Sequence, residues 1–189
     1  MIKTLLATLA AAALVIPAQA EPIKESEYNT MHSMGCMLLG ECTDGVEKVY
    51  SMLDISSQYD NTEEYTGVTG EFHNMLHSLN LVGVNVFLAD EKYFPKGHRG
   101  VYHTVSNNFF LNKNFMGSPG TLMMVMRHEG WHAAQDCMAG TIDNSLIAII
   151  KPEDEVPMIW RVMAERTYPE SAVPWEAEAQ WAGRTENMT

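Results

Sequence analysis

The chain has 189 residues, of which 46% are hydrophobic and 19% are charged, values that fit one globular domain and exclude a disordered chain. Its formal net charge of −12 argues against a nucleic-acid-binding surface and against docking on an anionic membrane, because both need clustered Lys and Arg. Three cysteines are too few for a fold built on disulfides, so the fold must depend on a hydrophobic core.

The first 20 residues have the layout of a cleaved secretory signal. Lys3 gives a positive start, an apolar run rich in Ala and Leu covers residues 5–16, and small residues precede Glu21. The run is shorter than the roughly 20 residues that a membrane-spanning helix needs. We therefore expect residues 1–20 to be a signal peptide and residues 21–189 to form a single domain. The mature protein is expected to be exported, periplasmic or secreted, without a stable membrane anchor.

Export would allow a disulfide bond to persist. Cys36 and Cys42 can close a small loop, and Cys137 can instead pair with either of them. The sequence leaves these three pairings open, and each leaves one thiol over. No Cys-x-x-Cys motif occurs, which argues against a zinc ribbon or a redox pair.

The first half of the mature chain is predicted to mix helices, strands and loops. Apolar periodicity, β-branched runs and turn residues define these segments. In chain order we expect a partly helical segment 31–50 with interruptions near 35–36 and 40–43, a helix 64–79, a strand 81–89, a loop 90–100, and one or two strands over 101–111 with a turn at 107–108.

The second half is predicted to be mainly helical, and its clearest element is a helix over residues 121–139. Capping side chains and Pro119 precede that helix, and Gly140 stands where a left-handed C-terminal cap is expected. In chain order there follow an apolar segment 142–150 expected to continue as helix, an acidic loop 151–157, a helix 158–166, a connector 168–173, and a last helix from Pro174 to about residue 183.

The strongest predicted helix contains the sequence His128-Glu129-Gly130-Trp131-His132. Histidines at i and i+4 lie one turn apart, about 40° around the helix axis, so both imidazoles can face one ion. Glu129 lies about 60° from His132, where its carboxylate can reach a water beside the ion without binding the ion. The apolar neighbours predict a buried helix, in which unpaired His and Glu would be costly. The pattern therefore predicts a metal site with Glu129 as general base.

This segment resembles the active-site helix of the zincin metallopeptidases, whose hallmark is His-Glu-x-x-His. The flanking residues 125–127 and 133–134 agree with the longer form of that pattern. Gly130 is the misfit, because glycine inside a helix costs about 1 kcal/mol relative to alanine. The resemblance implies Zn²⁺ held by His128, His132 and a third ligand, and hydrolysis of peptide bonds.

The third ligand is expected from a later helix. No histidine follows at the metzincin spacing, so the resemblance is to the gluzincins, which supply a downstream glutamate. Glu176 and Glu178 are the candidates, and only one can face the ion because they lie about 200° apart on a helix. We favour Glu176, because Glu-x-x-Ala resembles the third-ligand segment of several gluzincins. Gln180 stands where that segment usually has Asp, so Gln180 or Gln135 is expected to orient a ligand.

A second histidine pair, His73 and His77, has the same spacing. Asn74 stands where a general base would be needed, so we expect this pair to lie on an ordinary helix surface or to line the substrate cleft.

Two further roles follow from the resemblance. Residues 100–105 can form the edge strand that in zincins holds the substrate backbone by strand addition. Transition-state charge is expected to be met by Tyr168, Arg161, Arg166 or His103, which the sequence does not rank.

These observations predict a small zincin-like α+β domain. A short mixed or antiparallel sheet is expected to pack on the metal helix, with further helices at the C-terminal end. The expected function is a zinc-dependent metallopeptidase acting on a peptide or protein substrate, for example a cell-wall peptide, and not on nucleic acid. The alternative is an exported zinc-binding protein without turnover, in a structural or interaction role.

Overall fold

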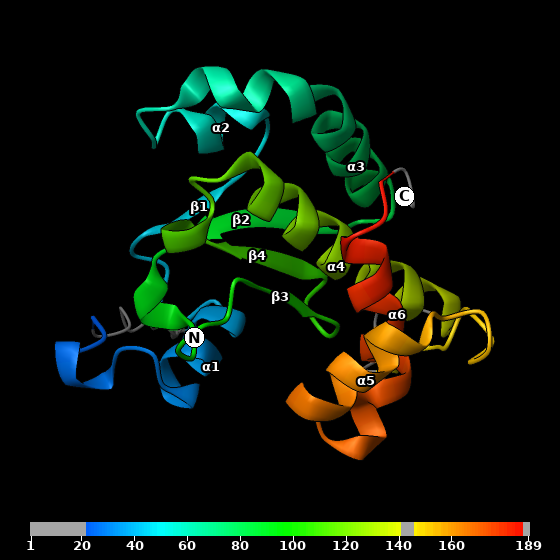
Figure 1. The fold of residues 1–189 in the computed structure, drawn as a ribbon. Helices are drawn as coiled ribbons and strands as arrows, with labels where there is room; N and C mark the ends of the chain where they lie inside the picture. Colours follow the sequence, from blue (N-terminus) through cyan, green and yellow to red (C-terminus); the bar gives the residue numbers. More distant parts are fainter. Residues whose placement is uncertain (1–21, 141–145, 187–189) are drawn as a thin grey trace, which may run out of the picture.

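The computed structural model describes residues 22–140 and 146–186. Within these ranges the chain forms six α-helices and a four-stranded sheet (Figure 1), so the predicted α+β class is confirmed. The helices are α1 (Met31–Leu38), α2 (Met52–Ser56), α3 (Thr69–Leu81), α4 (Pro119–Met138), α5 (Met158–Thr167) and α6 (Val173–Gly183). The strands are β1 (Val46–Lys48), β2 (Asn85–Ala89), β3 (Gly100–His103) and β4 (Asn108–Asn112). The predicted signal peptide lies outside the described residues.

The sheet is mixed and is covered on both faces. Its strand order is β1-β2-β4-β3, with β2 parallel to β4 and each outer strand antiparallel to its neighbour. Side chains alternate between the faces of a strand. Phe109 and Leu111 therefore enter the core with α3 and α4, while Phe110 packs with Met37 and Tyr93 on the side of α1. This arrangement leaves β3 as an outer strand that contacts α4 (Figure 1).

Helix α4 has the boundaries that its sequence predicts, to within two residues. The Ser118 hydroxyl accepts a hydrogen bond from the Thr121 N–H at 3.4 Å, and Gly140 adopts a φ of 123° just beyond the helix end. Two hydrogen bonds of 2.6 Å join the Arg127 guanidinium to the Glu71 carboxylate of α3. The helix is thereby fixed at both ends and along one side.

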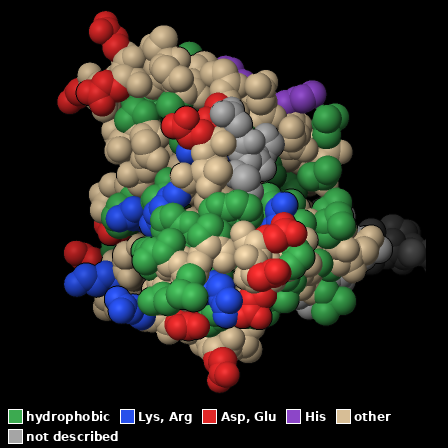
Figure 2. All heavy atoms as spheres, turned by 45° about the vertical axis from the view of Figure 1, so that its right-hand side comes forward, with side chains coloured by type: hydrophobic (Ala, Val, Ile, Leu, Met, Phe, Trp, Pro, Cys, Tyr) green, Lys and Arg blue, Asp and Glu red, His purple; other side chains and the backbone are tan. Residues whose placement is uncertain are grey.

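Helices α5 and α6 form a separate layer beside the C-terminal half of α4 (Figure 1). Trp131 of α4 packs with Ala179 and Ala182 of α6. Hydrophobic side chains spread over this side of the molecule, with basic and acidic side chains between them (Figure 2). Met158 and Ile159 of α5 are among its exposed apolar residues.

Several sequence predictions need correction. Helix α1 is not interrupted near residues 35–36. Residues 46–48 form a strand because they pair with β2, a contact between distant segments that local sequence does not encode, and helix α2 was not predicted. Residues 146–150 are not helical, since the Ala148 N–H donates to the carbonyl of Gln135 and the Ile150 N–H donates to Glu178. The remainder of the predicted segment 142–150 lies outside the described residues.

The open disulfide pairing is settled by the fold. Cys36 and Cys42 are bonded, with their Cα atoms 5.2 Å apart, and Cys137 is a free, exposed cysteine. Among the described residues, no helix combines the length and the apolar character needed to cross a membrane.

Candidate metal centre

Helix α4 presents both histidines of the motif on one face. The ring centroids of His128 and His132 are 4.9 Å apart, as expected for side chains separated by one helical turn. One nitrogen from each ring and one carboxylate oxygen of Glu129 all lie within 4.8 Å of one another. The three motif residues therefore meet at one point, as their spacing predicts.

Helix α6 brings Glu176 to the same point. Its Oε2 lies 3.5 Å from His128 Nε2, and its Oε1 lies 3.7 Å from His132 Nε2. Two ligand atoms placed about 2.1 Å from one zinc ion at a tetrahedral angle would be about 3.4 Å apart. Each imidazole nitrogen is thus close to the spacing at which it could share one ion with an oxygen of Glu176.

One carboxylate oxygen of Glu176 lacks a hydrogen-bond partner in the described part of the chain. Its Oε2 is buried and accepts no hydrogen bond among the described residues. Burial raises the pKa of this carboxyl, but interaction with His128 and His132 outweighs burial and lowers the pKa to about 2. A buried carboxylate that stays ionised beside two imidazoles is a donor set that suits Zn²⁺.

Glu178 faces away from this point and has a different set of partners. It is fully buried and accepts hydrogen bonds from the side chains of Trp131 and Gln135 and from the backbone N–H groups of Ile150 and Lys151. The distances are 2.6–3.2 Å. Of the two candidates on the last helix, only Glu176 lies at the histidines.

Gln135 orients His132. Its Nε2 donates to Glu178 and to the carbonyl of Trp175, so its Oε1 is the atom that faces His132 Nδ1, at 2.8 Å. This pattern assigns the imidazole proton to Nδ1 and leaves Nε2 free to bind an ion. Gln180, the other predicted orienting residue, instead accepts a hydrogen bond from Arg184 at 2.6 Å.

Glu129 is held by the edge strand. The Tyr102 N–H of β3 donates to Glu129 Oε2 at 2.9 Å. β3 can approach this closely because residue 100 is glycine. A Cβ at that position would lie 2.5 Å from Val125 Cγ1 and 3.3 Å from Glu129 Oε1. The backbone of β3 and the Glu129 carboxylate are therefore in direct contact, which the sequence did not indicate.

The chain matches no family model, no curated protein and no solved structure. The predicted resemblance to zincins, carried by residues 125–134 and 174–183, therefore has no support from related proteins. Any functional conclusion therefore has to come from the side chains themselves.

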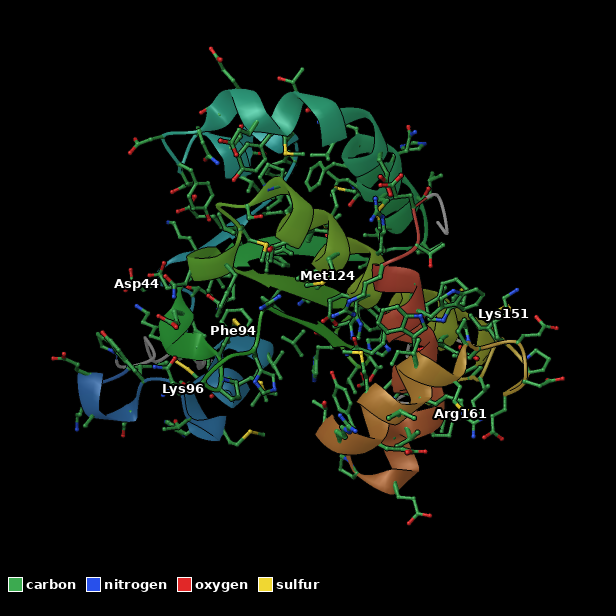
Figure 3. The ribbon with its side chains drawn as sticks, viewed as in Figure 1. Asp44, Phe94, Lys96, Met124, Lys151 and Arg161 are labelled. Atoms are coloured by element: carbon green, nitrogen blue, oxygen red, sulfur yellow. A yellow bond between two sulfur atoms is a disulfide. The ribbon has the colours of Figure 1, made fainter. Side chains whose placement is uncertain are left out.

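The four candidates for stabilising transition-state charge lie in different places. Tyr168 is next to the centre: burial raises the pKa of its phenol, and the negative charges of Glu176 and Glu129 raise it further. Arg161, on α5 (Figure 3), is paired with Glu153. The Nδ1 atom of His103 lies 2.6 Å from the Ser106 hydroxyl in the turn after β3. Arg166 is exposed in the last turn of α5. Tyr168 is thus the candidate that its surroundings favour.

The second histidine pair has no part in this centre. His73 and His77 are exposed on α3, and His73 Nε2 accepts a hydrogen bond from the Met52 N–H at the start of α2. The expectation of a surface pair fits this placement.

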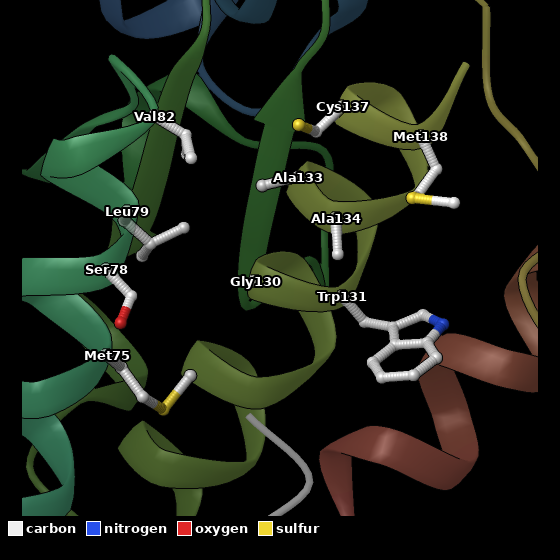
Figure 4. A pocket seen from close by; sticks show the side chains of 10 residues that line it. All are labelled: Met75, Ser78, Leu79, Val82, Gly130, Trp131, Ala133, Ala134, Cys137 and Met138. Carbon is white, nitrogen blue, oxygen red and sulfur yellow. The ribbon is translucent and has the colours of Figure 1, made fainter. Parts of the chain in front are cut away.

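A separate apolar pocket lies between α3 and α4, with a volume of about 330 Å³. Figure 4 shows Met75 and Leu79 of α3, with Val82 just after that helix, facing Ala133 and Ala134 of α4 across it. Gly130 lines its wall, and a Cβ there would lie 3.3 Å from the Met75 methyl group. Because that methyl group can shift, this contact does not by itself explain the glycine inside the motif.

Proposed function

We propose that this protein is a zinc-dependent metallopeptidase, exported from the cell, in which His128, His132 and Glu176 hold the ion. The observation that carries the proposal is the position of the Glu176 carboxylate. A side chain 44 residues beyond His132 approaches both Nε2 atoms, while one of its buried oxygens has no other partner in the described structure. The donor set of two imidazoles and a carboxylate is one that catalytic zinc sites use.

Each side chain would have a separate part in the reaction. Bound Zn²⁺ would polarise the scissile carbonyl and make water acidic enough to react near neutral pH. Glu129 takes a proton from the attacking water and passes it to the leaving amine as the C–N bond breaks. The Tyr102 N–H fixes Oε2 of that carboxylate, which leaves Oε1 for the proton. Tyr168 donates a hydrogen bond to the oxygen on which negative charge develops.

The substrate would be a peptide or protein segment bound in extended form. β3 is an outer strand, and its Arg99 carbonyl is bonded to Asn112 of β4 while its Tyr102 N–H points to Glu129. Alternate residues of a strand direct their backbone groups to opposite edges, so Gly100 and Tyr102 face the centre. An extended peptide can pair along this edge and pass in front of the ion.

Zinc content of the purified mature chain tests the ligand set. We expect about one equivalent in the wild type and less than about half in His128→Ala and Glu176→Ala, since catalytic zinc needs three protein ligands. His77→Ala is the matched control, because His77 is exposed on α3. Less than half an equivalent in the wild type would refute the metal assignment.

Glu129→Gln tests the reaction. The variant should keep its zinc and lose at least about 100-fold in the rate of peptide hydrolysis, because the amide cannot accept the proton. Unchanged hydrolysis would refute the role of Glu129. Full zinc occupancy with no hydrolysis of any peptide by the wild type would instead favour a zinc-binding protein without turnover.

A further inference from the structure

Two arginines lie beside the centre, one on each side of α4. Arg99 directly precedes Gly100, and Arg184 directly follows Gly183. Both glycines touch the part of α4 that carries the motif: a Cβ on Gly183 would lie 3.0 Å from the Met124 carbonyl oxygen and 3.2 Å from His128 Cβ, and a Cβ on Gly100 would meet Glu129. The start of β3 and the end of α6 therefore flank the same turn of α4, on the side toward its N-terminal half (Met124 in Figure 3).

Neighbouring side chains hold each guanidinium in place. The Arg184 guanidinium carbon lies 5.0 Å from the centre of the Trp160 ring, and Nη1 donates to Gln180 Oε1 at 2.6 Å. The guanidinium carbon of Arg99 lies 5.6 Å from the centre of the Phe115 ring. Stacking of this kind positions the charge without neutralising it.

Neither arginine has a carboxylate within 4.0 Å among the described residues, whereas Arg127 and Arg161 are each paired. Gly100 and Gly183 place the two arginines at the same part of α4, and both side chains are exposed. In agreement with this placement, burial lowers the pKa of Arg184 and the positive charge of Arg99 lowers it further. The chain has 24 acidic and only 12 basic side chains. Two neighbouring arginines that have no carboxylate partner among the described residues thus form a positive site beside the candidate metal centre of a strongly acidic protein.

We propose that Arg99 and Arg184 together bind a carboxylate of the peptide substrate, an assignment that rests on the proposed peptidase function. Guanidinium groups match a carboxylate through paired N–H donors, and such charge-assisted hydrogen bonds are about twice as strong as neutral ones. The carboxylate belongs either to the C-terminus of the substrate or to an acidic side chain near the cleaved bond. A peptide antiparallel to β3 ends at Gly100, beside the arginines, which places a C-terminal carboxylate there.

Peptide binding, measured apart from turnover, tests this assignment. The probes are three acetylated alanine hexapeptides: one with a free C-terminal carboxylate, one amidated, and one amidated with aspartate in the last position. Binding is measured by calorimetry in the zinc-loaded Glu129→Gln protein, with and without Arg99→Gln, Arg184→Gln or both. Lys96→Gln is the control, because it removes the same charge from an exposed residue on the side of α1 (Figure 3).

The free-acid peptide should bind at least about tenfold more tightly than the amide, because only the acid can make the charge-assisted bonds. Either arginine variant should remove most of this preference, the double variant should abolish it, and Lys96→Gln should retain it. Preference for the free acid over the aspartate amide identifies a C-terminal carboxylate, and the reverse identifies an acidic side chain. Equal affinity for all three peptides, or no change in the arginine variants, would overturn the assignment.

The same measurements separate this inference from the proposed function. Arginine-dependent preference for the acidic peptides, with no hydrolysis by the wild type, would support carboxylate binding and refute the peptidase. Hydrolysis by the wild type of free-acid and amidated peptides at equal rates would support the peptidase and refute carboxylate binding.

Discussion

Glu176 and Glu178 are two residues apart on α6, yet their surroundings are opposite. Glu178 is fully buried and accepts four hydrogen bonds, which join α4, α6 and the segment before Lys151. Glu176 faces two imidazoles across 3.5 and 3.7 Å and keeps a buried oxygen without a hydrogen bond in the described part of the chain. Glu178 is thus a structural residue, whereas Glu176 faces the two histidines of the candidate metal centre.

The contrast shows how the fold stays stable although one buried oxygen of Glu176 has no hydrogen bond among the described residues. A buried charge without partners destabilises a protein, whereas a carboxylate with several N–H donors does not. The four bonds to Glu178 hold α6 against α4 whether or not Glu176 has a partner. Gln135 connects the two sides, since it contacts both His132 and Glu178.

Removing the two carboxylates should lower the free energy of unfolding by very different amounts. This difference is the largest effect that we expect. Glu178→Ala leaves four buried donors without an acceptor, so we expect a loss of at least about 3 kcal/mol in the free energy of unfolding. Glu176→Ala should cost the metal-free protein less, about 1–2 kcal/mol, because it removes only the contacts of this carboxylate with the two imidazoles. Urea unfolding of metal-free protein at pH 8 measures both. Equal losses would mean that Glu176 is a structural residue.

Gln135→Ala should weaken zinc binding and lower the stability of the fold at the same time. His132 loses the acceptor that fixes its proton on Nδ1, and residues that orient metal ligands in this way typically contribute 10–100-fold to affinity, so zinc should bind at least about tenfold more weakly. Glu178 loses one donor, which should lower stability by about 1–3 kcal/mol. Competition with a zinc-sensitive dye gives the affinity. Gln180→Ala is the control, and the connection would be disproved if both variants bound zinc equally.

The sequence alone predicts only part of this contrast, because the rest depends on how the helices pack. The ends of α4 and the convergence of His128 with His132 follow from local rules of capping and helical spacing, and both agree with the structure. The choice between Glu176 and Glu178 depends on which side of α6 meets α4, which is a tertiary property. The backbone donors of residues 150 and 151 were missed because they lie at the junction of a segment predicted to be helical with one predicted to be a loop, and their bonds to Glu178 are tertiary contacts.

The flanking arginines were missed for a related reason. Nothing in the local sequence of Arg99 or Arg184 differs from that of a solvated surface arginine. Their proximity arises because Gly100 and Gly183 let β3 and α6 approach the same turn of α4. A glycine beside an arginine is a weak signal in one sequence, and it acquires meaning only from the contact that it permits.

Two glycines of the α4 region allow the closeness of α6 to be tested. Gly183→Ala places a Cβ 3.0 Å from a backbone oxygen of α4, which cannot move aside, so we expect a loss of about 1–3 kcal/mol and weaker zinc binding. Gly130→Ala meets only the flexible Met75 methyl at 3.3 Å and gains up to about 1 kcal/mol of helix propensity. Thermal unfolding with and without zinc separates the effects. If Gly130→Ala were the more harmful, close packing of α6 would not be what shapes the site.

Another buried carboxylate, that of Asp136, extends the comparison and gives the smallest expected effect. Asp136 of α4 accepts a hydrogen bond of 2.6 Å from the Tyr102 hydroxyl, and its Oδ1 is buried without a partner among the described residues. It resembles Glu176 in this respect but has no imidazole nitrogen within 4.0 Å among the described residues, and burial raises its pKa. The folded protein then holds the Asp136 proton to higher pH than the unfolded chain does. Its contribution to stability therefore falls as the pH rises from about 4 and becomes constant once both states are ionised.

Asp136→Asn removes this ionisation and keeps an oxygen to accept the Tyr102 hydrogen bond. The variant should therefore gain up to about 1 kcal/mol relative to the wild type at pH 7, and the gain should disappear toward about pH 3, below the unfolded pKa of about 3.9, where the wild-type side chain is protonated in both states. Urea midpoints of metal-free protein between about pH 3 and 7 measure the difference. A gain that does not depend on pH would show that the carboxylate is no less stable at this position than in water. Asp136 would then no longer show what burial does to a carboxylate without neighbouring imidazoles. The contrast with the lowered pKa of Glu176 would be lost.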